Sequence, residues 1–562
     1  MNALPATANG KALCVIGETS VRDVIIEEVG AKAYNLMRMT ETGLAVPPGF
    51  VLDTGWCRTY HEGGQRLDKG VIDLVVEGVQ RVERATGLAF GAGRRPLLVA
   101  VRSGAAVSMP GMLETILNIG LSDETLPGLL RATGDPVFVW DSYRRLIQSY
   151  GEVVDGCPAA AFAAVLNSAK VKYGVPSAAE LDVASLRNVV VDLKDVYQSV
   201  VGHPFPQDPL TQLLGAVEAV LRSWNGPRAI EYRALKGLDD LDGTAVIVQA
   251  MVFGNMGVTS GAGVGFTRDP STGEDRLYVD FLLNAQGEDV VAGGLPGGDS
   301  DAVVAALPGL AHELQLVRRR LEALFADAQD FEFTVEEGKL WLLQARAGKC
   351  TPWAALHIVC DLVDEGLIDP ATAVRRLRDI DLDGIARVSV AATDGVAPIG
   401  HGIPAGTGVA SGRVALSVEA AHRYADRGDP VVLVRDEAST EDIAGFAVCS
   451  GLVTAVGGRT SHAAVVARQL GIVCVVSCDR LSLDTDRKRL SIGPHEFNEG
   501  DVITVDGNVG VVYNGELQVR REVPQELIDR VRGWQAALGG RVADEDKGVP
   551  LEGTGGRAPR PW

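Results

Sequence analysis

The sequence predicts a multidomain protein of mixed α/β and α+β class. Its 562 residues favour about three to four folded units. Helical patterns cover about 131–197, a polar hairpin pattern covers 330–346, and short apolar strands alternate with helices after Ile403. The boundaries we expect are a first domain over 1–350 with its helical insert, a helical linker and hinge over 351–402, a third domain over 403–515, and a C-terminal helix and flexible tail over 516–562.

Two basic residues in the first domain stand beside turn-forming segments. Lys32 lies in the segment GAKAYNL, and Arg102 follows the buried strand pattern LLVAV and precedes a Gly/Met/Pro-rich loop. A lysine is a point charge that can follow a moving phosphate, and an arginine is a planar fork that can bind two oxygens. Both therefore suit a triphosphate site, although each residue taken alone is more often a solvated surface charge.

The segment from Thr244 to Gly254 predicts a strand that enters a turn. A glycine-rich run follows it at 260–273. Glycine is also the default turn residue, so this run is weak evidence for a nucleotide site. Its interest comes from its position between the predicted strand and an acidic strand further along the chain.

That acidic strand forms one half of a predicted hairpin. Side chains alternate along a strand, so Asp330, Glu332 and Thr334 share one face of the first strand. Gln344 and Arg346 lie together on the partner strand, and a Glu-Glu-Gly-Lys turn joins the two strands. Two carboxylates and an amide oxygen suit Mg²⁺, which prefers oxygen ligands. The alternative is an ordinary polar outer face of a hairpin.

The region after residue 350 changes character twice. An apolar period of 3.6 residues over 351–378 predicts a pair of helices, and the Gly/Asp/Ala/Pro-mixed stretch 379–400 reads as a hinge. Short strands are predicted at 431–434 and 451–454, and a helix at about 525–538.

One histidine stands at a predicted helix start. In the segment GGRTSHAAVVAR the two glycines allow a tight turn, Thr460 or Ser461 can cap, and the Ala/Val run propagates a helix from His462. A phosphoryl group on this ring would meet free N–H groups, the positive end of the helix dipole, two hydroxyls and Arg459 or Arg468. The alternative is a histidine that only packs or caps.

The run GGRTSHAAVVARQLG closely resembles the phosphohistidine signature of the pyruvate, phosphate dikinase and phosphoenolpyruvate synthase family. The resemblance extends to Gly30–Leu36, Val46–Phe50 and Pro96–Gly120, and so covers nearly the whole chain. It implies an ATP-grasp nucleotide-binding domain with a helical insert, followed by a swivelling β/β/α phosphohistidine domain.

The resemblance also implies a role for each candidate residue. Lys32 and Arg102 would bind the ATP phosphates, and the backbone at about Gln249 to Val252 would read the adenine edge. Asp330, Glu332 and Gln344 would bind Mg²⁺ and ATP, and Arg346 would neutralise charge on the transferred group. His462 would carry the phosphoryl group, with Thr460 and Ser461 beside it. Thr460 matches a threonine that is phosphorylated to switch off plant members of the family.

The reaction that the resemblance implies splits ATP to AMP. The βγ unit would go to His462, inorganic phosphate or water would take the γ group, and the phosphohistidine would pass its phosphoryl group to a separate acceptor. The residues after Gly515 are too few for the pyruvate-binding barrel of roughly 250 residues. We therefore expect pyruvate bound to a partner protein. The alternatives are a metabolite hydroxyl, as in the related rifampicin phosphotransferases, and a catalytically silent ATP-binding regulatory or docking paralogue.

Two departures from the family pattern stand near these residues. Arg459 takes the place of a methionine in the signature, which adds a positive charge beside the histidine. Gly294–Gly298 replaces an Arg-Thr-Pro element, so the use of inorganic phosphate could differ here.

Composition narrows the class of protein. A net charge of −20 makes nucleic acid an unfavourable partner. No apolar run reaches the ~18–20 residues of a membrane span, and the first ten residues lack the shape of a signal peptide, so we expect a cytoplasmic protein. The eight cysteines are scattered and indicate neither a zinc site nor a disulfide framework. Oligomeric state is left open, with a homodimer as one possibility.

Overall fold

The computed structural model describes residues 13–17, 24–107, 109, 113–287, 290, 307–391, 395–437, 442–458, 462–485 and 487–538. These residues form two compact units. The first unit contains the residues up to Met256 and the short segment Trp341–Gln344, and the second contains Gly257–Leu340 and the residues from Ala345 onward. The structure confirms the mixed α/β, multidomain class that the sequence predicts.

The first unit is built on a five-stranded antiparallel sheet. In sheet order the strands are β1 (Cys14–Ile16), β2 (Gly49–Leu52), β7 (Ala245–Ala250), β5 (Val99–Gly104) and β6 (Thr115–Ile119). All six residues of β7 are buried, which fits its place at the centre of the sheet. A short parallel pair, β3 (Ala89–Phe90) and β4 (Pro96–Leu97), lies outside this sheet.

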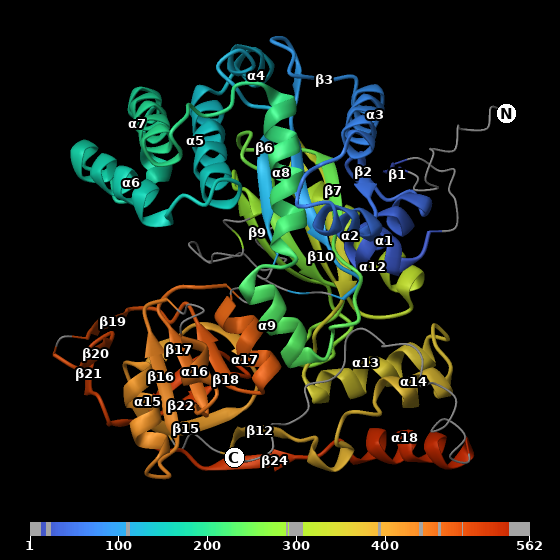
Figure 1. Ribbon diagram of the computed structural model, residues 1–562. Helices are drawn as coiled ribbons and strands as arrows, with labels where there is room; N and C mark the ends of the chain where they lie inside the picture. Colours follow the sequence, from blue (N-terminus) through green and yellow to red (C-terminus); the bar gives the residue numbers. More distant parts are fainter. Residues whose placement is uncertain are drawn as a thin grey trace. The chain divides into compact units, whose positions relative to one another are not determined.

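The helices of the first unit pack on this sheet and on one another. They are α1 (Ile26–Glu41), α2 (Thr54–Glu62), α3 (Lys69–Thr86), α4 (Leu126–Thr133), α5 (Pro136–Val153), α6 (Ala159–Tyr173), η1 (Ala178–Glu180), α7 (Val183–Val201), α8 (Pro209–Ser223) and α9 (Pro227–Lys236). Aspartates at the N-caps of α3, α5, α7 and α8 accept hydrogen bonds from the first turn, which is why these helices begin where they do. Helices α5, α6 and α7 lie side by side (Figure 1) in the region predicted as a helical insert.

The second unit begins with a four-stranded sheet in the order β11-β10-β8-β9. The strands and the helix between them are β8 (Gly261–Phe266), β9 (Tyr278–Leu283), α12 (Pro308–Phe325), β10 (Gln329–Glu336) and β11 (Lys339–Ala347). Strands β10 and β11 form the predicted hairpin. Its turn residues Glu337 and Gly338 both have positive φ, the conformation that tight hairpins favour.

The glycine-rich run at 260–273 contains a central strand of this sheet rather than a phosphate loop. Gly261, Gly263 and Gly265 alternate along β8, where added Cβ atoms would lie 2.2, 2.4 and 2.3 Å from the rings of Phe281, Phe333 and Phe331. The glycines therefore make room for three aromatic rings.

A matched pair of Gly→Ala variants tests this explanation. Gly265→Ala should lower the free energy of unfolding by about 1–3 kcal/mol, because the new methyl group overpacks the Phe331 ring. Gly309→Ala, in α12, has open space around its Cβ and should be neutral or slightly stabilising. Urea unfolding of both variants measures the difference, and equal stability would contradict the packing argument.

The predicted helical pair at 351–378 is confirmed as α13 (Pro352–Asp364) and α14 (Pro370–Arg376). Helix α18 (Gln525–Ala537), far away in sequence, packs beside both (Figure 1) and shares their apolar cluster. The stretch predicted as a hinge contains η2 (Leu382–Gly384) and a strand, β12 (Arg387–Val390), which pairs antiparallel with β24 (Val519–Glu522). The segments that enter and leave residues 400–515 are therefore joined to each other.

Residues 400–515 form an eight-stranded sheet with helices on it. In sheet order the strands are β13 (Gly400–His401), β23 (Val511–Asn514), β22 (Val502–Asp506), β15 (Val409–Ala415), β16 (Val431–Arg435), β17 (Gly451–Thr454), β18 (Val473–Val476) and β14 (Ile403–Gly406). Strands β15 to β18 are parallel, and the helices between them are α15 (Val418–Ala425), α16 (Ile443–Phe446) and α17 (His462–Leu470). A small sheet of β19 (Leu481–Asp484), β20 (Arg489–Ile492) and β21 (His495–Asn498) adjoins it.

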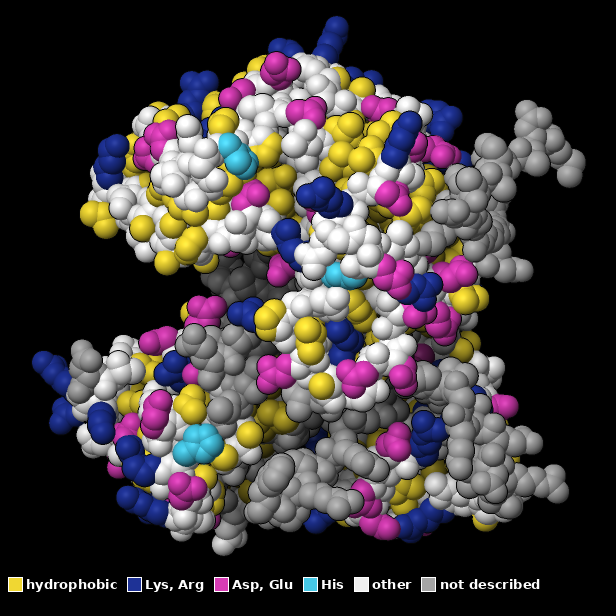
Figure 2. Space-filling view, viewed as in Figure 1, with side chains coloured by type: hydrophobic (Ala, Val, Ile, Leu, Met, Phe, Trp, Pro, Cys, Tyr) yellow, Lys and Arg dark blue, Asp and Glu magenta, His cyan; other side chains and the backbone are white. Residues whose placement is uncertain are grey.

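The described surface carries both signs of charge despite the net charge of −20. Figure 2 shows basic and acidic side chains interspersed over the visible face. Among the described helices, none combines the length and the apolar character that a membrane span requires.

Candidate functional site

The predicted site residues fall in both units. Lys32, Arg102, Gln249, Val252 and Gln344 belong to the first unit, and Asp330, Glu332, Arg346 and His462 belong to the second. Arg459, Thr460, Ser461 and the segment Gly294–Gly298 lie outside the described residues.

Lys32 lies in the first regular turn of α1, because the helix bends sharply just before it. Gly30 has φ 77° and ψ 155°, and a Cβ there would come 2.2 Å from the carbonyl oxygen of Gly104. The next residue, Ala31, donates its N–H to the carbonyl oxygen of Ala105 at 3.0 Å. The start of the regular helix is therefore held against the end of β5, the strand that carries Arg102. A helix N-terminus with a lysine beside it suits an anion.

Arg102 lies close to the segment that carries Gln344. Its Nη1 donates to the carbonyl oxygen of Leu343 at 3.1 Å, and the neighbouring Leu342 donates its N–H to the carbonyl oxygen of Ala45 at 2.8 Å. Gln344 is buried. The first unit thus brings together two residues that are far apart in sequence and that the resemblance assigns to the nucleotide.

The predicted adenine-reading segment follows the central strand β7. Gln249 is 2% exposed, and its Nε2 donates to the carbonyl oxygen of Pro47 at 2.9 Å. The backbone N–H of Ala250 bonds to the carbonyl oxygen of Pro48 at 2.8 Å. The side chain of Gln249 therefore holds the end of this strand, and Val252, half-buried, comes directly after it.

In the second unit the buried Asp330 forms an ion pair with the half-buried Arg346. Nε of Arg346 donates to Oδ2 of Asp330 at 2.8 Å, and Nη2 of Arg346 lies 2.8 Å from the same oxygen. The other oxygen, Oδ1, is buried and has no hydrogen-bond partner among the described residues. Burial raises the pKa of Asp330, and the guanidinium of Arg346 opposes this shift only in part. A buried carboxylate oxygen without a partner is suited to a bound cation.

Strand pairing places a third carboxylate on the same sheet face. Val264 on β8 pairs with Glu332 on β10 and with Asp280 on β9, and Asp330 pairs with Phe266, two residues further along β8. Directly paired residues and residues two apart share a face. Asp280 is 3% exposed and was missed from the sequence, because only the pairing of β9 brings it here.

This acidic face fits Mg²⁺ in the way nucleotide sites do. Among the described residues, no group of three or more His, Cys, Asp or Glu side chains has the spacing of a complete metal site. Mg²⁺ in such sites takes one or two protein carboxylates and completes its shell with phosphate and water. The unpartnered Oδ1 of Asp330 would be available as one such ligand.

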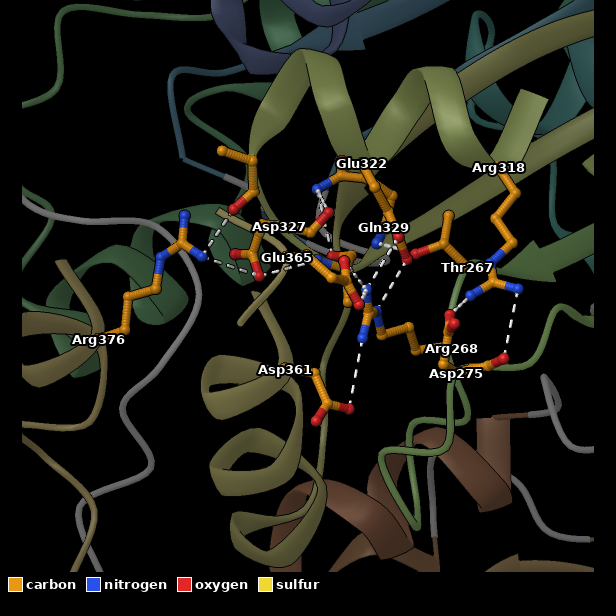
Figure 3. A network of polar contacts seen from close by, with 12 residues as sticks. Thr267, Arg268, Asp275, Arg318, Glu322, Asp327, Gln329, Asp361, Glu365 and Arg376 are labelled. Atoms are coloured by element: carbon orange, nitrogen blue, oxygen red, sulfur yellow. Dashed lines mark hydrogen bonds and ion pairs between the residues drawn. The ribbon is translucent and has the colours of Figure 1, made fainter. Parts of the chain in front are cut away.

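A cluster of ion pairs surrounds the buried side chain of Arg268 (Figure 3). The Arg268 side chain is 1% exposed, and its Nε and Nη2 donate to the two carboxylate oxygens of Glu322 on α12 at 3.1 and 3.2 Å. Nη2 also donates to Glu365 at 2.7 Å, and Nη1 lies 3.5 Å from Asp361 on α13. One guanidinium thus joins the sheet to two helices.

Thr267 and Gln329, both drawn in Figure 3, connect this cluster to the residue after Gln329, Asp330. Thr267 donates its N–H to the carbonyl oxygen of Gln329 at 2.9 Å, and Gln329 donates its N–H to Oγ1 of Thr267 at 2.8 Å. Asp330 is the next residue along β10, so its position depends on this pair.

Removal of the Arg268 guanidinium should be strongly destabilising. Arg268→Met leaves Glu322, only 8% exposed, without its partner, and should lower the free energy of unfolding by about 3–5 kcal/mol. Arg530→Met breaks the more exposed ion pair between α18 and Asp364 and should cost about 0–1 kcal/mol. Thermal unfolding of both variants provides the comparison, and equal shifts would contradict the role given to burial.

His462 begins α17, as the sequence predicts. The helix follows β17 and lies at the carboxyl end of the parallel strands, where open α/β sheets bind ligands. In the connecting loop, Gly457 has φ 128°, and Oγ of Ser477 donates to its carbonyl oxygen at 2.7 Å. The first turn of a helix has backbone N–H groups without helical partners, which favours an anion at this end.

Comparison with known proteins finds two matching families and several relatives. Residues 65–310 match the family described as pyruvate phosphate dikinase, AMP/ATP-binding domain, and residues 428–510 match PEP-utilising enzyme, mobile domain. Pyruvate, phosphate dikinase of Clostridium symbiosum is 42% identical over 521 residues, which are 92% of this chain and 59% of that protein. The chloroplastic pyruvate, phosphate dikinase 1 of Arabidopsis thaliana is 41% identical over 512 residues, which are 91% of this chain and 53% of that protein.

The chain thus spans about half the length of the curated relatives it matches. These matches lend no support to the expectation of pyruvate bound to a separate partner protein. The chain therefore carries the AMP/ATP-binding domain of the pyruvate, phosphate dikinases and the mobile domain of the PEP-utilising enzymes, and it is homologous to pyruvate, phosphate dikinase over about nine-tenths of its own length.

Proposed function

We propose that this chain transfers a phosphoryl group from ATP to His462 and then to an acceptor, as a dikinase-type phosphotransferase. The observation that supports this best is the start of α17 at His462, at the carboxyl end of the parallel strands of the matched mobile domain. The first domain would be of the ATP-grasp type, and the second would swivel between nucleotide and acceptor.

The first step forms a bond between a ring nitrogen of His462 and the β-phosphorus of ATP. The bond between that phosphorus and the α–β bridging oxygen breaks, and AMP leaves with the oxygen. Inorganic phosphate or water then attacks the γ-phosphorus, the bond to the β–γ bridging oxygen breaks, and one phosphoryl group stays on the ring. A neutral imidazole is the nucleophile, and the helix dipole favours that neutral form.

The chain's own residues would bind and orient the nucleotide. Lys32 and Arg102 would bind the triphosphate, the backbone at about Gln249 to Val252 would contact adenine, and Arg346 would neutralise charge on the transferred group. The residues that would hold Mg²⁺ are Asp330, Glu332 and Gln344. Bound Mg²⁺ supplies neutralisation of phosphate charge. Thr460 and Ser461 would donate hydrogen bonds to the phosphoryl group on His462.

The relatives carry pyruvate in their names, so pyruvate is the acceptor to test first. A mobile carrier suits any acceptor that binds away from the nucleotide, because one ring must then reach two places.

Labelled ATP tests the proposal. With ATP labelled at the β-phosphorus, we expect AMP formation and acid-labile label on the protein. Discharge of that label by pyruvate is a separate test of the acceptor. ATP binding without AMP and without protein label would overturn the proposal and favour a silent binding protein. Formation of ADP with label from the γ-phosphorus alone would contradict the dikinase scheme.

A further inference from the structure

Arg468 contacts two parts of the second unit that are far apart in sequence. It lies on α17, six residues after His462, and is 8% exposed. Its Nη1 donates to the carbonyl oxygen of Ala405 at 3.4 Å. Ala405 lies on β14 of the eight-stranded sheet in residues 400–515, the sheet on which α17 packs. Its guanidinium carbon also lies 5.7 Å from the ring centroid of Phe266, on β8 of the sheet that carries Asp330. One side chain therefore joins the histidine helix to the acidic sheet.

The charge of Arg468 is placed to act on the acidic face. Phe266 pairs in register with Asp330, and its neighbour Val264 pairs with Asp280. Burial lowers the pKa of Arg468, and both aspartates oppose that shift, as does the thiol of Cys474. Arg468 in turn lowers the pKa of Asp330, against the larger effect of burial. A cation over an aromatic ring in a desolvated setting is an attractive contact.

The helix that carries Arg468 is fixed to its own sheet. Ala464 and Ala467 are completely buried in the apolar cluster between α17 and the strands. Six residues at 1.5 Å each separate Arg468 from the helix start by about 9 Å. Six steps of about 100° also put it on a different helix face from position 462. The sequence indicated Arg468 as a partner of the phosphoryl group, but this placement suits control of where the helix start lies.

We infer that Arg468 is a positioning residue that docks the His462 helix on the nucleotide-binding sheet through Phe266. This inference rests on the proposed function and deepens it. Arg468 would act when His462 receives the phosphoryl group from the nucleotide. The competing explanation is that Arg468 only holds α17 on the eight-stranded sheet, by its hydrogen bond to Ala405.

A double-mutant cycle on the full chain separates these explanations. The readout is the single-turnover rate of acid-labile labelling from ATP labelled at the β-phosphorus, together with the ATP concentration at half-maximal rate. Arg468→Met should lower the maximal rate by about 10–100-fold, because small misplacements of reacting groups are costly. Half-maximal ATP should change by less than about twofold, since Arg468 would not bind the nucleotide.

Coupling to Phe266 is the discriminating result. If Arg468 docks on that ring, Phe266→Leu should slow labelling and add little in the Arg468→Met background. Arg468→Lys should recover part of the rate, because a cation stays over the ring. Arg423→Met is the matched control, since Arg423 lies over the ring of Tyr424 within a single helix, α15, and this variant should label at the wild-type rate.

Several outcomes would overturn the inference. The first is that the effects of Arg468→Met and Phe266→Leu on the labelling rate multiply in the double variant. The second is that Arg468→Met labels at the wild-type rate. The third is that Arg468→Met lowers only the thermal stability. If Arg468→Met does not fold, the same cycle is run with Arg468→Lys. Wild-type protein without any label would instead show that the proposed function itself is wrong, which keeps the two failures distinguishable.

Discussion

A His462→Asn variant is expected to incorporate no acid-labile phosphoryl group from ATP. Asparagine is well tolerated at a helix start but has no nucleophilic ring nitrogen, so the P–N bond cannot form. ATP binding should stay within about twofold of wild type, because the residues proposed to bind the nucleotide are untouched. Scintillation counting after base and acid treatment, with ATP binding followed by calorimetry, measures both quantities.

The control for this variant is His495→Asn. His495 is an exposed histidine on β21 of the same region, and its loss should leave labelling unchanged. Equal labelling of wild type and His462→Asn would remove His462 from the account. Loss of label in both variants would point to a general defect instead of a carrier role.

Replacement of Arg346 by methionine should lower the labelling rate by about 10²–10³-fold. A preorganised cation that faces developing charge typically contributes this much to a reaction rate. The variant also removes the partner of Asp330, whose pKa is already raised by burial. Without the guanidinium that pKa rises further, so less of the carboxylate is ionised at a given pH.

The sign of the pH effect follows from this shift. In the proposed mechanism the rate depends on ionised Asp330, and the acid limb of the pH–rate profile should therefore move to higher pH in Arg346→Met. Arg346→Lys should restore the position of the limb in part, because it keeps the charge. Lys339→Met, at the exposed end of the same strand β11, is the control. An unchanged rate and an unchanged acid limb would show that Arg346 only stabilises the hairpin.

Local elements near the site could be predicted because their patterns are short-range. Alternation of side chains predicted the β10–β11 hairpin, and apolar runs predicted β7, β16 and β17. The glycine pair before Arg459 and Thr460 predicted the start of α17. Each of these depends on neighbours within a few residues, so the sequence carries the information directly.

Contacts between distant segments could not be predicted in this way. Asp280 joins the acidic face only through the pairing of β9 with β8, and Arg268 meets Glu322 and Glu365 across helices that no local pattern relates. The glycines of β8 were open to several explanations until the three phenylalanine rings were placed against them. The pairing of β12 with β24 is likewise non-local and lies within the stretch predicted as a hinge.

The central claim is that His462 itself carries a phosphoryl group taken from ATP, and peptide mapping of the wild-type protein tests it most directly. Trypsin cleaves after Arg459 and Arg468 and releases Thr460–Arg468, in which His462 is the only histidine. After incubation with Mg²⁺ and ATP, this peptide should gain the mass of one phosphoryl group that is lost in acid and kept in base. An acid-stable group on Thr460 or Ser461, or no gain in mass on this peptide, would contradict the account.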